Sequence, residues 1–314
     1  MSLLVALNVA KADYDQCGNV EMTSGRLKFV SRERPVLIAG PTASGKSALA
    51  LDISDRLGGV IINADALQVF ANWRVLTARP SQHEESQAPH FLYGHMPWDA
   101  LYSVGHWLRD VKPLITAGPR PIIVGGTGLY FSALTQGLAE IPETPAEIRA
   151  IADAQIAAEG TAKMLADLDA KTLARIDQQN PMRVQRAWEV LQTTGRGLAD
   201  WQDETPAPLL PLDAADTILI DADKDWLNER IDLRFDQMIQ IGALEEARLN
   251  LDSFDPKLPS AKAIGAPELI DHLRGNRDLK DAVAAGKIAT RQYAKRQRTW
   301  FRSKMRKWRA ILMP

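Results

Sequence analysis

Residues 36–47 read Val36-Leu37-Ile38-Ala39-Gly40-Pro41-Thr42-Ala43-Ser44-Gly45-Lys46-Ser47. The first four are apolar, which predicts a short buried strand of a parallel sheet. The next eight match the phosphate-loop pattern G-x-x-x-x-G-K-[ST]. Backbone N–H groups of such a loop can surround a phosphate, Lys46 supplies positive charge, and the Ser47 hydroxyl can ligate Mg²⁺. All eight are therefore candidate phosphate-binding residues, although the pattern does not say which molecule carries the phosphates.

Three further apolar runs indicate that this strand belongs to a sheet. They are residues 60–62, 121–124 and 217–220. Apolar residues at helical spacing lie between and after them, over residues 47–57, 224–251 and 287–308. Strands that alternate with helices predict an α/β fold, here a P-loop NTPase-like parallel sheet with helices on both faces.

The composition also divides the chain into parts. Residues 1–34 are polar and interrupted by glycines, which predicts a poorly ordered N-terminal extension. Residues 139–205 lack apolar strand runs, and helical patterns over 146–168 and 182–191 predict an all-helical insertion. Residues 35–138 and 206–314 then form the P-loop α/β core, which ends in basic helices.

The overall composition excludes several classes of protein. The 314 residues are 46% hydrophobic and 25% charged, which excludes a globally disordered or collagen-like chain. No apolar run reaches the roughly 18–20 residues of a membrane span, so no membrane partner is expected. The apolar run at residues 3–9 lacks the basic flank of a signal peptide. A single cysteine, Cys17, excludes an intrachain disulfide and favours a reduced, cytoplasmic protein.

The near-neutral net charge hides a basic C-terminal segment. Residues 287–314 contain ten basic and no acidic residues, so the net charge of −1 leaves −11 on the other 286 residues. Two stripes of a helix are expected here, one basic (Arg291, Lys295, Arg298, Arg302, Arg306 and Arg309) and one apolar (Ala294, Phe301, Met305, Trp308 and Leu312). A basic stripe favours a polyanionic partner such as nucleic acid, with a solvated basic helix as the alternative.

Polar residues follow two of the other predicted strands. Asp65 comes just after residues 60–62, where it could act as a metal ligand, a general base or a turn former. The nearby Gln68 carries an amide that can read an adenine edge. Thr127 follows Gly125 and Gly126, which permit close approach of a ligand, and it could offer its hydroxyl to that ligand or cap a helix.

Taken together, these motifs resemble those of the tRNA dimethylallyltransferase (tRNA isopentenyltransferase) family. The resemblance rests on Gly40–Ser47, Asn63-Ala64-Asp65-Ala66-Leu67-Gln68-Val69 and Gly125–Tyr130, in this order and spacing. Further matching segments are Thr77-Ala78-Arg79-Pro80, Asn180–Ala187 with Thr194-Gly195-Arg196, Ala263-Ile264-Gly265, and Thr290–Gln297 with Thr299–Arg302. The resemblance covers about residues 35–302.

The resemblance implies transfer of a dimethylallyl group from dimethylallyl diphosphate to N6 of adenosine 37 in tRNA, with Mg²⁺ as cofactor. The phosphate loop would then hold a diphosphate instead of ATP. Asp65 matches the family's base and Thr127 a threonine that holds the reacting end. The flipped adenosine would be contacted by Asp65, Ala66, Leu67, Gln68 and Thr127.

The same resemblance assigns the grip on the anticodon stem-loop. In the insertion the implied tRNA-binding residues are Arg149, Met182, Arg183, Val184, Gln185 and Arg186. On the basic helix they are Arg291, Lys295 and Arg298. We expect the protein to act as a monomer.

One departure from the family pattern concerns diphosphate binding. After A-I-G the family usually has a Tyr-Arg pair whose arginine helps to bind diphosphate, but here Ala266-Pro267 follows Gly265. Either Lys46 with a C-terminal basic residue such as Arg298 suffices, or diphosphate binding is weaker.

Three alternatives to this function stay open on the sequence. A small-molecule P-loop kinase would bind ATP and need no RNA. An adenylate isopentenyltransferase would prenylate free nucleotides. A catalytically silent RNA-binding module is disfavoured because Lys46, Ser47, Asp65 and Thr127 are all present.

Overall fold

The computed structural model describes residues 29–313. Within them one sheet of six parallel strands has the order β3-β2-β4-β1-β5-β6. The strands are β1 (Val36–Ala39), β2 (Val60–Asn63), β3 (His90–Phe91), β4 (Pro121–Gly125), β5 (Asp216–Ala222) and β6 (Arg309–Met313). The α/β fold with a parallel sheet is confirmed, and the four predicted strands correspond to β1, β2, β4 and β5.

The phosphate-loop strand lies inside the sheet. Val36 of β1 pairs with Ile122 of β4 on one side and with Asp216 of β5 on the other. A strand bonded on both edges and covered on both faces must be apolar throughout, and all four residues of β1 are buried. This is why the uninterrupted apolar run was a reliable strand signal.

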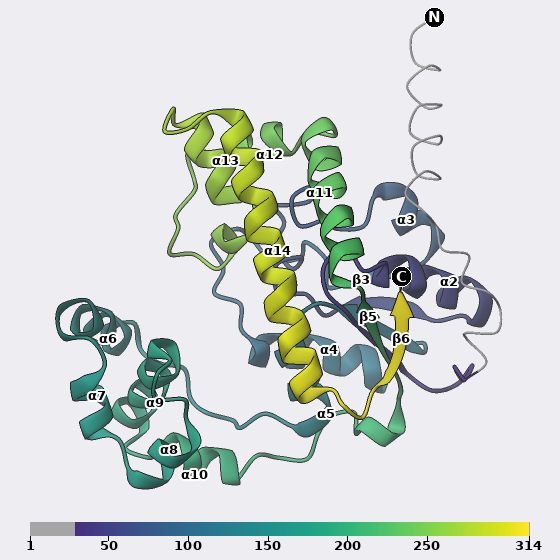
Figure 1. Cartoon of the computed structure of the whole chain (residues 1–314). Helices are drawn as coiled ribbons and strands as arrows, with labels where there is room; N and C mark the ends of the chain where they lie inside the picture. The colour runs from purple at the N-terminus through teal and green to yellow at the C-terminus, as the bar shows by residue number, and fades with distance from the viewer. Residues whose placement is uncertain (1–28, 314) are drawn as a thin grey trace, which may run out of the picture. The chain divides into compact units, whose positions relative to one another are not determined.

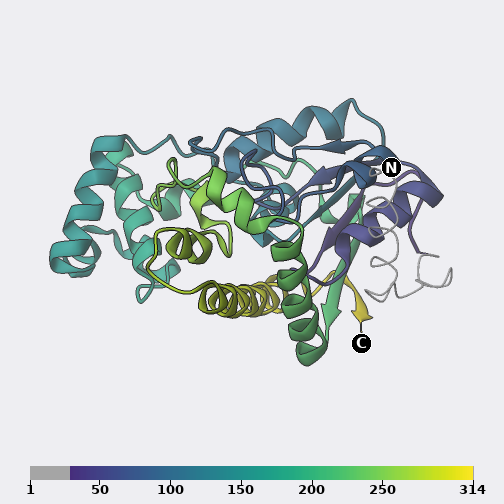
Figure 2. The ribbon, with the colours of Figure 1, turned by 90° about the horizontal axis from the view of Figure 1, so that it is seen from above.

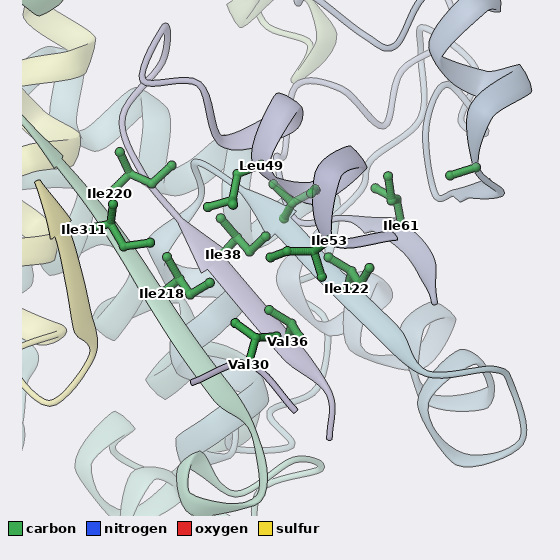
Figure 3. Packing of buried hydrophobic residues seen from close by; sticks show 13 residues of the cluster. Val30, Val36, Ile38, Leu49, Ile53, Ile61, Ile122, Ile218, Ile220 and Ile311 are labelled. Atoms are coloured by element: carbon green, nitrogen blue, oxygen red, sulfur yellow. The ribbon is translucent and has the colours of Figure 1, made fainter. Parts of the chain in front are cut away.

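The hydrophobic core lies between the sheet and α2 (Lys46–Leu57). Figure 3 shows Ile38 of β1 and Ile218 of β5 beside Leu49 and Ile53 of that helix. Val30 is 8% exposed and joins the same cluster.

The end of the predicted extension therefore packs on the core. Val30 is buried in the core cluster, and the N–H of the next residue, Ser31, donates to a carboxylate oxygen of Asp216 at 2.6 Å. The expectation of poor order for residues 1–34 is wrong for residues 29–34, because an apolar side chain and a backbone hydrogen bond hold them. Residues 1–28 lie outside the described residues.

The chain folds as two compact units. The first comprises residues 29–131 and 213–313, and the second is Ser132–Leu212. Helices of the first unit, besides α2, are α3 (Gln82–Gln87), α4 (Val104–Thr116), α11 (Lys224–Gln240), α12 (Ala243–Leu249), η2 (Ser260–Lys262), α13 (Ala266–Leu273) and α14 (Leu279–Lys304). Helix α5 (Gly128–Gln136) begins in the first unit and ends in the second, and η1 (Leu212–Ala214) also spans the boundary.

Two helices of the first unit end earlier than the sequence predicted. The expected helix 224–251 is divided between α11 and α12 by Gly242, whose φ of +112° is not helical. The expected helix 287–308 ends at Lys304, and residues 309–313 instead pair with β5 as an edge strand. Arg306, Arg309 and Leu312 therefore do not continue the predicted stripes, because strand pairing and burial of Ile311 outweigh the helical pattern. Figure 1 draws α14 in yellow alongside α11 in green.

The second unit is all-helical and has its own core. It contains the end of α5, then α6 (Ala146–Glu159), α7 (Ala162–Asp167), α8 (Ala170–Arg175), α9 (Pro181–Thr194) and α10 (Leu198–Asp203), which Figures 1 and 2 draw in teal. Met164, Val184 and Trp188 are buried among these helices. The pattern over 146–168 forms two helices because Gly160 has a φ of +71°. None of the helices in residues 29–313 is both long and apolar enough to cross a bilayer.

The central position of Ile38 gives a test of this packing. Its side chain is fully buried between strands and α2. We expect Ile38→Ala to lower the free energy of unfolding by about 2–5 kcal/mol, because the cavity that it leaves can only partly collapse. Leu312→Ala, at a position 69% exposed, is the matched control and should change the free energy of unfolding by less than about 0.5 kcal/mol. Urea unfolding of both variants makes the measurement, and equal effects would contradict the assigned core.

Candidate active site

The order of the strands brings three loops together. Strand β4 lies between β1 and β2. The segment after β1 leads to Lys46, the one after β4 carries Thr127, and the one after β2 carries Asp65. In parallel α/β sheets, ligands bind at this carboxyl edge. The residues singled out in three separate motifs therefore share one edge of the sheet.

The phosphate loop ends at the start of α2. Gly45 is the N-cap in the left-handed conformation (φ +88°), and Lys46 is the first helical residue. Burial lowers the pKa of Lys46 to about 8, while the charge of Asp65 raises it and that of Arg234 lowers it. Lys46 thus lies close enough to one negative and one positive side chain for both to act on its pKa. A bound anion would restore its full charge.

Two side chains from distant helices hold the loop in place. The Arg230 Nε donates to the carbonyl oxygen of Ala43 at 3.0 Å, beside the positive φ of that residue (+62°). The Gln297 Oε1 accepts the Thr42 N–H at 2.9 Å, and its Nε2 donates to the Gly126 oxygen at 3.0 Å. Gln297 is 6% exposed. It therefore links the phosphate loop directly to the loop that carries Thr127.

Asp65 is fixed by its neighbours at the end of β2. Its own N–H donates to Asn63 Oδ1 at 2.8 Å, and the Asn63 amide donates to its carbonyl oxygen at 2.9 Å. The Leu67 N–H donates to Asp65 Oδ1 at 3.0 Å. A Cβ added to Gly126 would lie 3.1 Å from Asp65 Oδ2 and 2.3 Å from the Gln297 amide nitrogen. Glycine at that position therefore keeps the second carboxylate oxygen accessible.

Thr127 lies across from this carboxylate. Its hydroxyl oxygen accepts the Ala66 N–H at 2.9 Å, and its own N–H donates to the Ala64 oxygen at 3.1 Å. The hydroxyl hydrogen is left to donate to a ligand. The helix-capping alternative for Thr127 is thus replaced by a bridge between the loops after β2 and β4.

Three tyrosines lie close enough to this carboxylate for its charge to act on their hydroxyl groups. Burial, and next the charge of Asp65, raises the pKa of Tyr93, Tyr130 and Tyr293. The phenols stay protonated at neutral pH, so none of them competes with Asp65 as a base.

The side chain of Gln68 is largely committed to the protein. Its Nε2 donates to the carbonyl oxygens of Thr77 at 2.8 Å and Ala78 at 2.9 Å. Both amide hydrogens are therefore used, so in this conformation the amide nitrogen is not available for the predicted contact with an adenine edge. Its carbonyl oxygen remains able to accept a hydrogen bond from an exocyclic amine.

A cavity of about 570 Å³, including the open solvent at its mouth, lies beside these groups. Its lining includes Thr42, Asp65 and Thr77, together with Arg234 and Tyr293. Arg234 was not predicted, although Arg230 and Arg234 are four residues apart on a predicted helix and so share a face. Arg298, the cation considered in place of the missing family arginine, does not line the cavity. The structure thus supplies a cation from α11 at the site.

The predicted tRNA-binding residues of the helical unit differ in accessibility. Arg183 is exposed, Met182 is 70% exposed, and Arg149 is exposed beside Glu189 at 3.9 Å. Arg186 is half-buried and donates to the Thr144 hydroxyl at 2.8 Å.

The remaining two predicted residues of that unit are buried. Val184 is fully buried, and Gln185, 9% exposed, donates to Asp153 and Glu189. These two hold helices together, and any contact with RNA is left to the accessible residues.

The predicted residues of α14 also differ. Arg291 is hydrogen-bonded to Asp232 of α11, and Lys287 pairs with Asp236 at 2.6 Å. Lys295 is exposed and Arg298 half-buried. Part of the basic stripe therefore ties α14 to α11, a role that charge counting along the sequence does not reveal.

The pKa of Lys46 predicts how anion binding depends on pH. Below about pH 8 the ammonium is charged, and above it the charge is lost before any anion binds. We expect the affinity for inorganic diphosphate to fall as pH rises from 7.5 to 9.5, in calorimetric titrations. Lys46→Arg, whose guanidinium stays charged, should show no such fall. A flat profile for the unaltered protein would contradict the lowered pKa.

The bridge made by Gln297 predicts a cost in stability. In Gln297→Leu, a part-buried N–H of Thr42 and a buried oxygen of Gly126 lose their partner. We expect the free energy of unfolding to fall by about 1–3 kcal/mol and diphosphate affinity to fall with it. Gln292→Leu, at an exposed position on the same helix, is the control. Equal stability of the two variants would argue against the bridge.

Comparison with known proteins agrees with this geometry. The IPP transferase family model matches residues 68–304. Over 282 residues the chain is 63% identical to a tRNA dimethylallyltransferase of Cereibacter sphaeroides, covering 90% of this chain and 97% of that protein. It is 64% identical over 280 residues to the tRNA dimethylallyltransferase of Roseobacter denitrificans, and this match covers 89% of this chain and 99% of that protein.

Solved structures show the same relationship. The tRNA isopentenylpyrophosphate transferase of Bacillus halodurans is 31% identical with a TM-score of 0.64, covering 89% of this chain and 90% of that one. A eukaryotic dimethylallyltransferase acting on tRNA shares the fold, with a TM-score of 0.74 at 23% identity. This match covers 89% of this chain and 74% of that one. The chain belongs to the IPP transferase family, and the two relatives from Cereibacter sphaeroides and Roseobacter denitrificans are both named tRNA dimethylallyltransferases.

Proposed function

We propose that this enzyme transfers a dimethylallyl group from dimethylallyl diphosphate to N6 of adenosine 37 in tRNA. The observation that carries the proposal is the convergence of a phosphate loop, a carboxylate and a hydroxyl at one sheet edge, beside a cavity that also holds Arg234. A kinase needs the first of these features. A kinase can also use a carboxylate, because its acceptor hydroxyl loses a proton as well, but a small-molecule kinase has no need of the helical second unit with its exposed arginines.

The diphosphate binds in the phosphate loop. Lys46, Arg234 and the N–H groups at the start of α2 neutralise its charge, which builds up as the carbon–oxygen bond breaks. These groups are worth most in a site shielded from water.

A Mg²⁺ ion would be held mainly by diphosphate oxygens and water. Within residues 29–313 no three His, Cys, Asp or Glu side chains cluster as a metal site. The exposed Ser47 hydroxyl, one residue into α2, is a hard oxygen donor that suits Mg²⁺. When bound, the ion adds positive charge next to the leaving diphosphate.

The transfer step exchanges one bond for another. The bond between C1 of the dimethylallyl group and the diphosphate oxygen breaks, and the oxygen keeps the electron pair. The adenosine N6 forms a bond to C1 and loses a proton to Asp65. The Thr127 hydroxyl donates a hydrogen bond to the adenine. The Gln68 oxygen accepts a hydrogen bond from the hydrogen that stays on N6.

The acceptor is the anticodon stem-loop, with adenosine 37 flipped out of its stack. Arg149, Arg183 and Arg186 contact its backbone, with Met182 exposed next to them. Lys295 and Arg298 add positive charge from α14. We propose that a monomer suffices, because one chain supplies every group in the step.

Replacing Asp65 tests the chemistry. With labelled dimethylallyl diphosphate, Mg²⁺ and a stem-loop carrying adenosine 37, we expect Asp65→Asn to lower kcat at least about 100-fold, the usual contribution of a general base. Its affinity for inorganic diphosphate should stay within about threefold. A guanosine-37 stem-loop is the control acceptor and should take no label.

Each alternative gives a different result when ATP or AMP is added to that assay. Consumption of ATP without label in RNA would replace the proposal with a kinase. Preferential labelling of free AMP over the stem-loop would replace it with an adenylate isopentenyltransferase.

The arginines of α9 test the grip on RNA. We expect Arg183→Ala to raise KM for the stem-loop several-fold and to reduce the dependence of KM on salt, with kcat little changed. The measurement is steady-state kinetics at several salt concentrations. Lys163→Ala, at an exposed position on α7, is the control within the same unit. An unchanged KM for Arg183→Ala would show that this face does not bind RNA.

A further inference from the structure

The cavity beside Asp65 is lined by both polar and apolar side chains. Thr42, Asp65 and Arg234 are among the polar ones. The apolar ones include Leu76, Ile231, Phe235, Met238 and Ile264. A ligand with a charged head and a short hydrocarbon chain matches this mixed lining, with its chain against the apolar side chains.

Phe235 is the largest of these side chains and is closely confined by the backbone of two glycines. It is 3% exposed and follows Arg234 directly on α11. A Cβ added to Gly286 of α14 would lie 2.3 Å from Phe235 Cζ. A Cβ added to Gly265 would lie 2.9 Å from the same ring and 3.2 Å from Leu76 Cδ2. The backbone behind the ring therefore leaves it no room to move away from the cavity.

Gly286 is placed here by packing and not by backbone conformation. It lies in the interior of α14, where alanine is the better helix former. Its φ is not positive, unlike that of Gly265 (+93°). The absent side chain is what lets the Phe235 ring sit as deep as it does, so Gly286 can be changed without straining the backbone.

We propose that Phe235, seated against Gly286, sets the length of hydrocarbon chain that the donor diphosphate can carry. Arg234 and Phe235 are consecutive residues of one helix and both line the cavity. The helix thus fixes the distance between a diphosphate-binding cation and the end of the apolar pocket. This inference rests on the proposed function, because it concerns the donor of that reaction.

Opposite changes at the two positions should have opposite effects. Gly286→Ala pushes the ring into the cavity, which makes the cavity shorter. Phe235→Leu removes part of the ring, which makes the cavity longer. The double variant Gly286→Ala/Phe235→Leu gives the added methyl group the space that the ring vacated, so it should recover much of the activity that Gly286→Ala loses.

The experiment compares dimethylallyl diphosphate with geranyl diphosphate, which is one isoprene unit longer, as donors to the stem-loop. We expect Gly286→Ala to raise KM for dimethylallyl diphosphate at least about tenfold, the size of effect that a single methylene has in a tight pocket. Phe235→Leu should raise kcat/KM for geranyl diphosphate relative to the short donor by at least tenfold. KM for the stem-loop and the affinity for inorganic diphosphate should stay within threefold for each variant.

Controls separate a pocket effect from a general loss of structure. Ile288→Ala, at a 48% exposed position on α14, should match the unaltered enzyme in every assay. Thermal unfolding of each variant identifies any that fail to fold, and the double variant tests the contact even if Gly286→Ala is destabilised.

Two results would overturn the inference. One is unchanged donor preference in Phe235→Leu, and the other is a double variant no better than Gly286→Ala with the short donor. If the unaltered enzyme transfers neither donor to RNA, the proposed function itself fails, and that outcome is distinct from both.

Discussion

The pairing of β4 between β1 and β2 is the constraint from which the site follows. It sets the phosphate loop, the Thr127 loop and the Asp65 loop next to one another at the carboxyl edge of the sheet. Gln297 then closes the arrangement from α14, because its amide bonds to the first two of these loops at once. A side chain from the last long helix of the chain thus fixes the geometry of the first loop.

The charges at this edge partly offset one another before any substrate binds. Lys46 lies close enough to Asp65 and Arg234 for both to change its pKa. The single carboxylate keeps two cations from repelling each other at full strength, and the tyrosines around it remain neutral. A diphosphate that enters meets positive charge which is already oriented, so little reorganisation is needed during the reaction.

Basic residues in α14 have two different roles. Arg291 and Lys287 are paired with acidic residues of α11, and these pairs hold together the two helices that form one side of the cavity. Lys295 remains exposed. The net charge of the segment therefore overstates what is available to a polyanion, since pairs between helices are invisible in the sequence.

The sequence by itself determined the parallel α/β fold, the phosphate loop and the position of Asp65 and Thr127 just after two strands, because each is encoded by a short contiguous pattern with a local physical cause. Apolar runs specify buried strands, and the loop glycines specify a backbone that can surround phosphate. The edge strands β3 and β6 were missed, because the two residues of β3 give no pattern and because β6 is stabilised by pairing with β5 and by burial of Ile311 in the core. Only the tertiary structure decided that Arg234 and Phe235 reach the cavity, that Gln297 joins two loops and that Val184 is buried. Those facts depend on which helix packs against which, over separations of up to 255 residues, and no local pattern in the chain records them.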